Sequence, residues 1–321
     1  MLDALARTVD IDEAAELLLG GDVCAFPTET VYGLGADAGN VDAVLKVFEA
    51  KGRPRFNPLI VHCADREMAE QLGYFDPISI RLAERFWPGP MTLAVPIRPD
   101  APVCDLVTAG LGTVGLRVPA NALAHELLAR VGKPVAAPSA NRSGHLSPTS
   151  AEHVLSSFEG RIPVLDGGSC AGGLESTILT VVNGQIIQLR PGAVARDEVA
   201  AATGMTPLVA ASGGKLQAPG MLASHYAPDA EIRLNADGPN EGEAWLGFGE
   251  ANQIFEQSGR NLSPTGDLRE AAKNLFGYLH ALDRTGVKSI AVAPIPEEGL
   301  GEAINDRLRR AAAPRDQSRT S

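Results

Sequence analysis

Helical and strand-like apolar patterns alternate through residue 195, and this alternation limits the possible folds more than any other feature. Apolar residues recur at i, i+3, i+4 and i+7 over residues 41–48, which predicts an amphipathic helix. An earlier helix is expected to end at Gly20-Gly21. Asn183-Gly184 separates two strand patterns and indicates a hairpin with a type I′ turn. These patterns predict an α/β fold with a mixed sheet. Further strands are expected at residues 23–26, 59–61, 91–97, 114–118 and 135–137.

The last third of the chain is predicted to hold a second, smaller domain. Residues 196–228 are rich in Ala, Gly and Pro and show little periodicity, so we expect a linker there. The expected organisation is a first domain over 1–195, the linker over 196–228 and a small α/β domain over 229–321. The last domain is predicted from a strand at 245–248, a helix at 268–282 begun by Ser263-Pro264, a strand at 290–293 and a helix at 300–308.

Charge and cysteine spacing narrow the class of protein. The formal net charge of -11 argues against broad binding to nucleic acid or membrane, because phosphate attraction depends on Lys and Arg. The four cysteines lack metal-ligand spacing, which indicates buried thiols and no zinc site. No secretory signal is evident, and no apolar stretch approaches the roughly 18 residues that a spanning helix needs. We therefore expect a cytoplasmic protein.

Two polar triplets suit the binding of a nucleotide triphosphate. Lys51-Gly52-Arg53 follows a predicted helix, and Ser139-Ala140-Asn141 follows a predicted strand. Together they offer cations, a hydroxyl and an amide as donors. Pro54 and Pro58 stiffen the first loop and reduce the entropy cost of holding donors in place. The alternative is a solvated run of charge at the first triplet and a helix N-cap at the second.

Three other segments carry polar groups at positions that favour a site. The loop after residue 26 has two threonines and a glutamate where α/β sheets usually bind ligands, or it is a turn that bonds its own backbone. Arg117 lies in an apolar strand and should pair with a carboxylate of the protein or of a substrate. His62 ends another strand, with either a structural or a binding role. The glycine-rich segment 166–177 is either a flexible connection or part of the site.

Several common catalytic motifs are absent from the sequence. No P-loop, Gly-x-Ser-x-Gly elbow or His-Glu-x-x-His pattern occurs. The phosphates of ATP would therefore have to be bound by an arrangement of donors other than a P-loop. The polar segments favour an enzyme that activates a small acid with ATP.

Ordered sequence blocks extend this hypothesis along nearly the whole chain. The first domain contains Pro27-Thr-Glu-Thr-Val-Tyr-Gly-Leu-Gly35, Lys51-x-Arg53-Pro54, Asn57-Pro58-Leu59, Trp87-Pro-Gly-Pro-Met-Thr92, Arg117-Val-Pro119, Pro138-Ser-Ala-Asn141-x-Ser143-Gly144 and Ser176-Thr-Ile178. The remainder contains Pro219-Gly-Met221, His225-Tyr-Ala-Pro228, Leu262-Ser-Pro264 and Ala303-Ile-Asn-Asp-Arg-Leu308. This ordered set resembles the YrdC-like family in its long, two-domain form.

The resemblance implies both a fold and an activity. The implied fold is a twisted mixed sheet with helices around a basic cavity, plus a smaller Rossmann-like α/β domain. The implied activity is that of a nucleotidyltransferase that converts L-threonine, bicarbonate or carbon dioxide, and ATP into threonylcarbamoyl-AMP and pyrophosphate. A separate transferase would then use this product to form threonylcarbamoyladenosine in tRNA. Mg²⁺ is expected with ATP, although the sequence identifies no ligands for it, and zinc, haem and NAD are not expected.

The resemblance also assigns residues to these substrates. The L-threonine set is Thr30, His62, Arg117, Ala137 and Ser176. The ATP set is Arg53, Asn57, Thr113, Ser139, Ser147, Arg190 and Tyr226. The catalytic phosphate cluster is Lys51, Arg53, Ser139 and Asn141. The linker that carries Tyr226 is expected to act as a lid, although Leu222-Ala-Ser224 stands where relatives usually have basic residues.

Two other classes of protein remain as alternatives. An RNA-binding module would use the basic concavity, but the acidic chain leaves room for only a weak tRNA contact. A carbamoyl-transfer enzyme of the hydrogenase-maturation type shares the core, but it carries acylphosphatase and cysteine-rich zinc segments that this sequence lacks. Pyrophosphate release that depends on threonine and bicarbonate distinguishes the first hypothesis from both.

Overall fold

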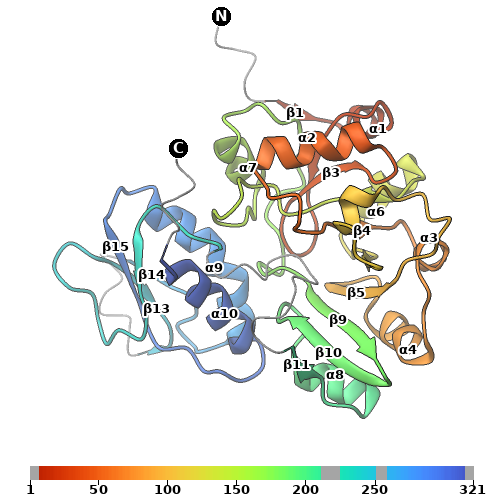
Figure 1. Cartoon of the computed structure of the whole chain (residues 1–321). Coiled ribbons are helices and arrows are strands. Elements are labelled where there is room, and N and C mark those ends of the chain that lie inside the picture. Colours follow the sequence, from red (N-terminus) through yellow and green to blue (C-terminus); the bar gives the residue numbers. More distant parts are fainter. Residues whose placement is uncertain (1–6, 211–224, 251–258, 315–321) are drawn as a thin grey trace, which may run out of the picture.

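The computed structural model describes residues 7–210, 225–250 and 259–314, which form two α/β bodies side by side (Figure 1). The larger body has a mixed sheet in the order β1-β8-β2-β3-β7-β4-β6-β5-β9-β10-β11. The smaller one has a parallel sheet in the order β12-β15-β13-β14. The mixed sheet and the second α/β unit that the sequence predicts are thus confirmed.

The larger body carries most of the elements. In chain order they are β1 (Thr8–Val9), α1 (Ile11–Leu19), β2 (Cys24–Phe26), β3 (Gly33–Asp37), α2 (Val41–Lys51), β4 (Ile60–His62), α3 (Arg66–Leu72), α4 (Pro77–Phe86), β5 (Met91–Pro96), α5 (Asp105–Thr108), β6 (Thr113–Arg117), α6 (Ala122–Val131), β7 (Val135–Ala136), α7 (Ala151–Ser157), β8 (Val164–Leu165), β9 (Thr177–Val182), β10 (Gln185–Arg190), α8 (Arg196–Thr203) and β11 (Leu208–Val209).

Helix α2 shows how local chemistry positions a polar segment. The Asn40 side chain accepts hydrogen bonds from the first backbone N–H groups of the helix, and Gly52 ends it in the left-handed conformation (φ 59°). The buried face includes Val44, Val47 and Phe48. Val44 and Phe48 of the predicted stripe are therefore buried, whereas Val41 is exposed. The helix therefore ends at Lys51, and the first polar triplet follows directly from its C-terminus.

The predicted hairpin is also present. Strands β9 and β10 pair in antiparallel register, with Gln185 opposite Val182. Asn183 and Gly184 have φ values of 51° and 73°, which agree with a type I′ turn. The hairpin carries Arg190 to the end of its second strand, where it faces the site described below.

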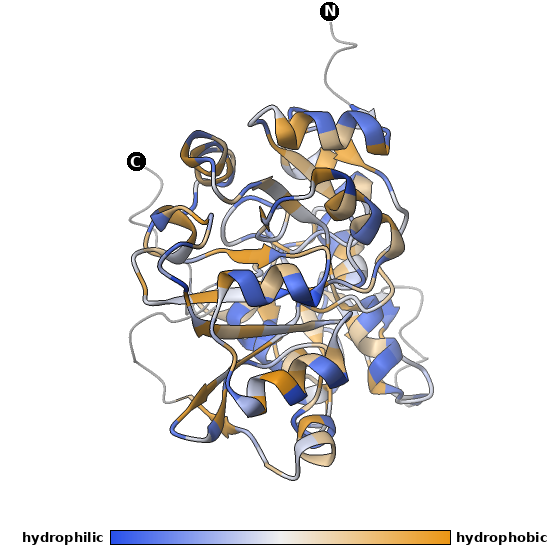
Figure 2. Cartoon of the chain, turned by 90° about the vertical axis from the view of Figure 1, so that its right-hand side faces the viewer, coloured by the Kyte–Doolittle hydropathy of each residue, from blue (hydrophilic) through white to orange (hydrophobic). Residues whose placement is uncertain are grey.

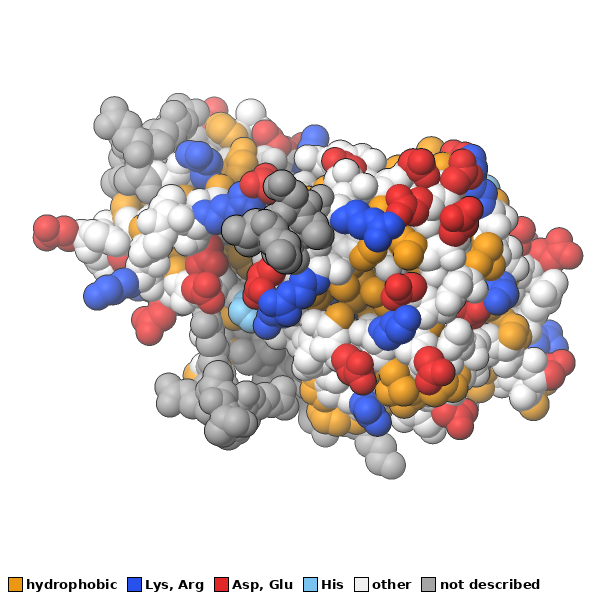
Figure 3. Space-filling model, turned by 90° about the horizontal axis from the view of Figure 1, so that it is seen from above, with side chains coloured by type: hydrophobic (Ala, Val, Ile, Leu, Met, Phe, Trp, Pro, Cys, Tyr) orange, Lys and Arg blue, Asp and Glu red, His pale blue; other side chains and the backbone are white. Residues whose placement is uncertain are grey.

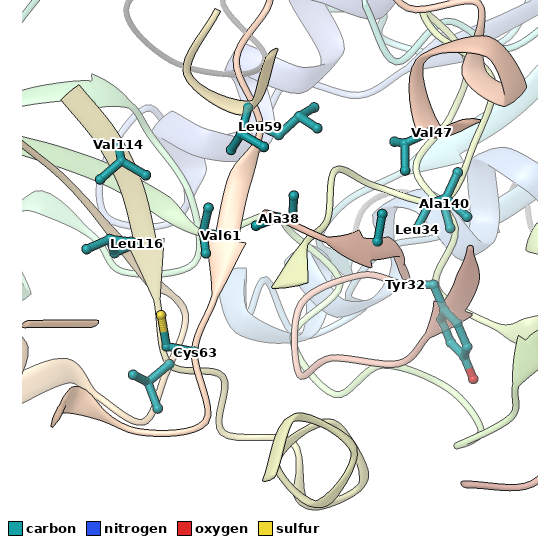
Figure 4. Packing of buried hydrophobic residues seen from close by; sticks show 14 of the residues in the cluster. Tyr32, Leu34, Ala38, Val47, Leu59, Val61, Cys63, Val114, Leu116 and Ala140 are labelled. Carbon is teal, nitrogen blue, oxygen red and sulfur yellow. The ribbon is translucent and has the colours of Figure 1, made fainter. Parts of the chain in front are cut away.

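The main core lies between the large sheet and the helices that cover it. Val61 of β4 and Leu116 of β6 lie side by side on neighbouring strands, with Leu59 and Val114 close by (Figure 4). Cys63 is a buried free thiol in the same cluster. The helices in Figure 2 carry hydrophilic and hydrophobic residues on different faces, as expected for elements that cover one side of a sheet. Burying each large aliphatic side chain contributes about 1.5–3 kcal/mol.

The segment after residue 195 differs from the prediction. The sequence favours an irregular linker there, but residues 196–203 form α8, which packs against α4, and β11 pairs with β10. Glu198 caps the helix by accepting a hydrogen bond from the backbone N–H of Ala195, and Gly204 ends it with φ 73°. The run of alanines hides this helix, because it offers little apolar periodicity although alanine favours helices. Residues 211–224 of the expected lid, including Leu222-Ala-Ser224, lie outside the described residues.

The smaller body contains β12 (Glu231–Arg233), β13 (Ala244–Gly247), β14 (Gly259–Asn261), α9 (Leu268–Asp283), β15 (Ser289–Val292) and α10 (Gly301–Ala312). The sequence analysis missed β12 and β14, which are three residues long and only partly buried. It also placed the start of α9 at Ser263-Pro264, whereas the helix begins at Leu268 with Asp267 as its N-cap. Ser263 instead accepts a hydrogen bond from the backbone N–H of Asp267.

The two bodies share an interface next to the polar loops. A Cβ atom on Gly173 would lie 2.4 Å from the Ala272 carbonyl oxygen, so only glycine permits this approach to α9. His153 of α7 stacks on His280 of α9 with ring centroids 3.9 Å apart. The Nε2 atom of His280 also lies 3.1 Å from the Ser147 carbonyl oxygen. A movement of α9 would therefore displace the loop that carries Ser147.

We expect the histidine pair to make stability depend on pH. Burial lowers the pKa of His153 to about 3 and that of His280 to about 4. Both values lie below the unfolded value, so the stabilisation is present above about pH 6.5 and is lost as pH falls toward the folded values. Urea unfolding should show a loss of about 1–3 kcal/mol from this pair between about pH 7 and about pH 5.

A variant with both His153→Phe and His280→Phe is the matched control. It keeps two stacked rings but removes the titrating nitrogens. Its free energy of unfolding should fall less over the same pH range than that of the wild type. Equal pH slopes for the two proteins would show that the pair does not contribute.

The described surface offers no broad basic face in the view of Figure 3. Lys and Arg side chains alternate there with Asp and Glu, in agreement with the acidic total charge. Within the described ranges, no helix is both long enough and apolar enough to cross a membrane.

Candidate active site

A polar pocket opens where several strands of the large sheet end and where the smaller body approaches. It collects residues from segments that are far apart in sequence. They are the loop after β2, the loop after α2, the ends of β4 and β6, the loop after β7, the residues before β9, the end of β10 and the start of the described range 225–250. The lining includes Thr30, Arg53, His62, Arg117, Ala137, Ser139, Ser176, Arg190 and Tyr226. These nine residues all belong to the set predicted from the sequence, so the structure brings most of the predicted site together.

One end of the pocket is rich in cations. Arg53 and Arg190 line it, and both are buried. Arg53 donates to the carbonyl oxygens of Asn57 and Pro58, at 3.2 and 2.8 Å, which fixes its guanidinium. Burial, and after it the opposing effects of Tyr226 and Arg190, leave the pKa of Arg53 lowered to about 10. It is charged at neutral pH, and a bound anion would relieve the repulsion between these cations.

Lys51 lies behind the pocket wall. Its ammonium donates to the carbonyl oxygens of Ser139 and Asn141, at 2.6 and 2.5 Å. Burial, assisted by the nearby Arg53 cation, lowers its pKa well below the ordinary value for lysine. The sequence analysis expected Lys51 to contact phosphate, whereas its amine here fixes the loop that carries Ser139.

Asn141 also lies behind the wall and shapes the same loop. It accepts a hydrogen bond from the Ser139 hydroxyl at 2.5 Å, and its amide nitrogen donates to the carbonyl oxygens of Arg142 and His145. Of the predicted phosphate cluster, Arg53 and Ser139 therefore reach the pocket, while Lys51 and Asn141 hold the loop in place.

The other end of the pocket suits a small amino acid. Arg117 donates to the Thr30 hydroxyl at 2.9 Å and to the Glu29 carboxylate at 2.5 Å. The carboxylate that the sequence predicts for Arg117 is therefore supplied by the protein in this structure. The Ser176 hydroxyl lies 2.8 Å from the Thr92 hydroxyl and also accepts from Arg190 at 3.1 Å, so Ser176 lies where the two parts of the pocket meet. The end offers a guanidinium, two hydroxyls and the backbone around Ala137 within one small space.

His62 adds a neutral polar group to this end. It lies opposite Arg117 in the parallel pairing of β4 with β6. Burial, followed by the Arg117 charge, lowers its pKa to about 3, so the ring is neutral at physiological pH. Its Nδ1 atom is buried and has no partner within the described part of the chain. A buried polar atom without a partner is costly, which favours a ligand at this position.

Three predicted ATP residues do not line the pocket. Thr113 borders a separate small cavity, Ser147 is buried behind Glu175, and Asn57 is buried beside Arg53. Both amide atoms of Asn57 lack a partner among the described residues. Asn57 is therefore available to a ligand that reaches past Arg53, whereas Ser147 must first leave Glu175.

Sequence reasoning missed several residues of the wall, including three that carry polar side chains. Thr28, Glu175 and His225 all line the pocket. Thr28 and Glu175 lie in loops that were selected for other residues, and His225 directly precedes Tyr226. Their adjacency to predicted residues was the only available signal, because a local pattern does not reveal which side of a loop faces a cavity.

The donor set argues against a metal held by protein carboxylates. Glu29 and Glu175 are the acidic residues closest to the pocket contacts above, and each is paired with an arginine. Among the described residues, no group of three or more His, Cys, Asp or Glu side chains is arranged to hold a metal ion. Within the described part of the chain, the acidic residues at the pocket therefore do not form a site that would hold Mg²⁺ by protein ligands alone.

A buried pocket lined by arginines at strand ends is typical of α/β enzymes that bind anionic ligands. Residues 16–192 match the family described as telomere recombination. Residues 185–313 match the threonylcarbamoyl-AMP synthase C-terminal domain. The chain belongs to the threonylcarbamoyl-AMP synthase family, and it is a nucleotidyltransferase.

Similar proteins cover almost the full length of the chain. Threonylcarbamoyl-AMP synthase from Pyrococcus abyssi is 40% identical over 93% of both chains. Its counterpart from Bacillus subtilis is 39% identical over 95% of this chain and 93% of its own. The crystal structure of P. abyssi Sua5 complexed with L-threonine superposes with a TM-score of 0.85 and 38% identity, covering 96% of this chain and 97% of that one. These similarities confirm both the family and the fold.

Proposed function

We propose that this chain makes threonylcarbamoyl-AMP and pyrophosphate from L-threonine, bicarbonate or carbon dioxide, and ATP, for threonylcarbamoyladenosine formation in tRNA. The observation that carries the proposal is the pocket itself, which joins the Arg117 subsite to the Arg53 and Arg190 cations. The similarity to a protein crystallised with L-threonine supports the identity of the amino acid. A separate tRNA-modifying transferase would receive the product, because the acidic chain is poorly suited to hold tRNA tightly.

The threonine subsite would contact each polar group of the amino acid. Arg117 would bind the carboxylate, in place of part of its present contact with Glu29. Thr30 and Ser176 offer hydroxyls, and Ala137 offers its backbone. His62 would use its unpaired Nδ1 atom for a polar group of threonine. The subsite would thereby hold the amine toward the cationic end.

The reaction needs only positive charges that are already held in place at the cationic end of the pocket. The threonine amine adds to carbon dioxide and loses a proton, which gives a carbamate. A carbamate oxygen then attacks the α-phosphorus in line, the new C–O–P linkage forms, and the bond to the β-phosphate breaks with release of pyrophosphate. Arg53 and Arg190 are placed to stabilise the charge that develops on the phosphate oxygens. The Ser139 hydroxyl would turn from Asn141 to donate to a phosphate, and Lys51 would keep its loop in position.

The remaining ATP assignments follow the same geometry. Tyr226 lines the pocket and is held in the left-handed conformation (φ 63°) against Phe276, with ring centroids 5.7 Å apart. The buried amide of Asn57, which has no partner among the described residues, would form a hydrogen bond with ATP. We propose the division into residues 1–195, 196–228 and 229–321; α8 and β11 of the middle segment join the larger body, and the part that carries Tyr226 would act as the lid over the nucleotide. Mg²⁺ would be bound through phosphate oxygens and water.

We expect strong discrimination against valine and weak discrimination against serine. Valine has the shape of threonine but lacks the hydroxyl, so buried polar groups of the pocket would lose their partner. Serine lacks only a methyl group, which is worth about 1–3 kcal/mol. Measured kcat/KM values for the three amino acids should therefore fall in the order threonine, serine, valine. Equal use of valine and threonine would contradict the subsite.

Pyrophosphate release tests the reaction class. The purified chain should release pyrophosphate from ATP only when threonine and bicarbonate are both present. Omission of either should reduce the rate to background. An RNA-binding module would give no release, and release that is independent of threonine would contradict the proposal.

A further inference from the structure

One arginine of the smaller body reaches the wall of the pocket. Arg307 of α10 is only 1% exposed in its side chain. Its Nε atom donates to Glu175 Oε2 at 2.8 Å, and one terminal nitrogen donates to the Pro191 carbonyl oxygen at 2.9 Å. The other terminal nitrogen pairs with Asp306 at 2.6 Å. Burying an arginine is costly unless its charge is paired, and Arg307 has two partners in the larger body. The smaller body supplies no other charge to the pocket wall described here.

Glu175 connects this arginine to the predicted nucleotide site. Glu175 is one of the residues that line the pocket, and its side chain is 7% exposed. One carboxylate oxygen accepts from Arg307, and the other accepts from the Ser147 hydroxyl. The backbone is fixed as well, since a Cβ atom on Gly192 would lie 2.4 Å from the Glu175 carbonyl oxygen. Glu175 is thus held at one place between the two bodies.

This arrangement opposes phosphate binding unless the negative charge of the Glu175 carboxylate is neutralised. A carboxylate on the wall repels a triphosphate, and the repulsion is strong in a desolvated pocket. A serine hydroxyl also has a single proton, and the Ser147 proton is given to Glu175. Ser147 can donate to a phosphate only if Glu175 releases it and is satisfied by Arg307.

We propose that Arg307 is a positioning residue for ATP: it neutralises Glu175 and anchors that carboxylate, so that the Ser147 hydroxyl can turn from Glu175 to a phosphate without leaving an unpaired charge. The inference rests on the proposed function, because it takes ATP as the substrate. The guanidinium of Arg307 also lies 5.0 Å from the centre of the Tyr226 ring. Through the Arg307 side chain, the smaller body thereby positions two residues of the pocket wall, Glu175 and Tyr226.

The charge mechanism predicts opposite effects from the two single changes. Arg307→Met leaves an unpaired carboxylate at the wall, so a non-hydrolysable ATP analogue should bind about tenfold more weakly. Glu175→Gln removes the negative charge at the wall and leaves Arg307 paired only with Asp306, so the analogue should bind more tightly than to the wild type. The double variant has neither charge and should return to within about threefold of wild-type affinity. Threonine affinity without nucleotide should change little in all three.

Controls keep this test decisive. Arg309→Met removes an exposed arginine of the same helix and should leave affinity unchanged. If Arg307→Met alone does not fold, the comparison of Glu175→Gln with the double variant still measures the effect of removing Arg307. A merely structural role predicts that both single changes weaken binding and that the double variant is weaker still, which would overturn the inference. A wild type that binds no ATP analogue would instead contradict the proposed function.

Discussion

Arg53→Ala is expected to lower kcat by about 100- to 1,000-fold, because it removes a fixed donor from the phosphate end of the pocket. Arg53 is buried, lines the pocket and is oriented by two carbonyl oxygens, so its charge needs no reorganisation when phosphate charge develops. Threonine binding should persist, because Arg117 lies at the other end. The measurement is single-turnover pyrophosphate release, with threonine affinity determined by calorimetry.

Arg55→Ala is the matched control for this change. Arg55 lies two residues along the same loop but is exposed. Its removal changes the same formal charge and should leave kcat within about twofold, as is usual for surface substitutions. Similar losses in the two variants would mean that net charge, rather than the oriented guanidinium of Arg53, assists the reaction.

Arg117→Gln is expected to weaken L-threonine binding by about 2–5 kcal/mol, the usual cost of truncating one member of a buried charged contact. The change removes the proposed partner of the substrate carboxylate and also leaves Glu29 without its cation. Affinity for an ATP analogue should change far less, because Arg53 and Arg190 remain. Calorimetric titration with each ligand separates the two effects.

Exposed Arg81 offers a comparison, since Arg81→Gln makes the same chemical change away from the pocket. The Glu29→Gln variant provides a second check, because it breaks the resting pair and keeps the guanidinium. It should bind threonine at least as well as Arg117→Gln does. Normal threonine affinity in Arg117→Gln, with the fold intact by circular dichroism, would contradict the carboxylate assignment.

Local patterns predicted the elements that local chemistry specifies. Helix α2 follows from its apolar spacing, its Asn40 cap and its Gly52 terminator, and the β9–β10 hairpin follows from Asn183-Gly184. Strands β12 and β14 escaped prediction because three residues in a partly exposed strand leave little periodic signal. Helix α8 escaped because its alanines favour a helix without an apolar stripe.

The site was predictable as a set of residue types, but not as a geometry. Arg117 was expected to meet a carboxylate, and Glu29 supplies it across 88 positions of sequence. The direction of the Lys51 ammonium toward two carbonyl oxygens could not be read from the triplet, because it depends on a loop about 90 residues away. The contact between Arg307 and Glu175 joins the two bodies over 132 positions, and no local pattern contains it.

Mass spectrometry of the reaction product tests the central claim most directly. The purified chain is incubated with ATP, L-threonine and isotopically labelled bicarbonate, and the mixture is quenched before the labile mixed anhydride hydrolyses. The account predicts a species with the mass of threonylcarbamoyl-AMP that carries the label from bicarbonate, and that is absent without threonine or with Arg53→Ala in place of the wild type. Formation of AMP and pyrophosphate without a labelled threonylcarbamoyl adduct, under conditions in which the authentic compound survives, would contradict it.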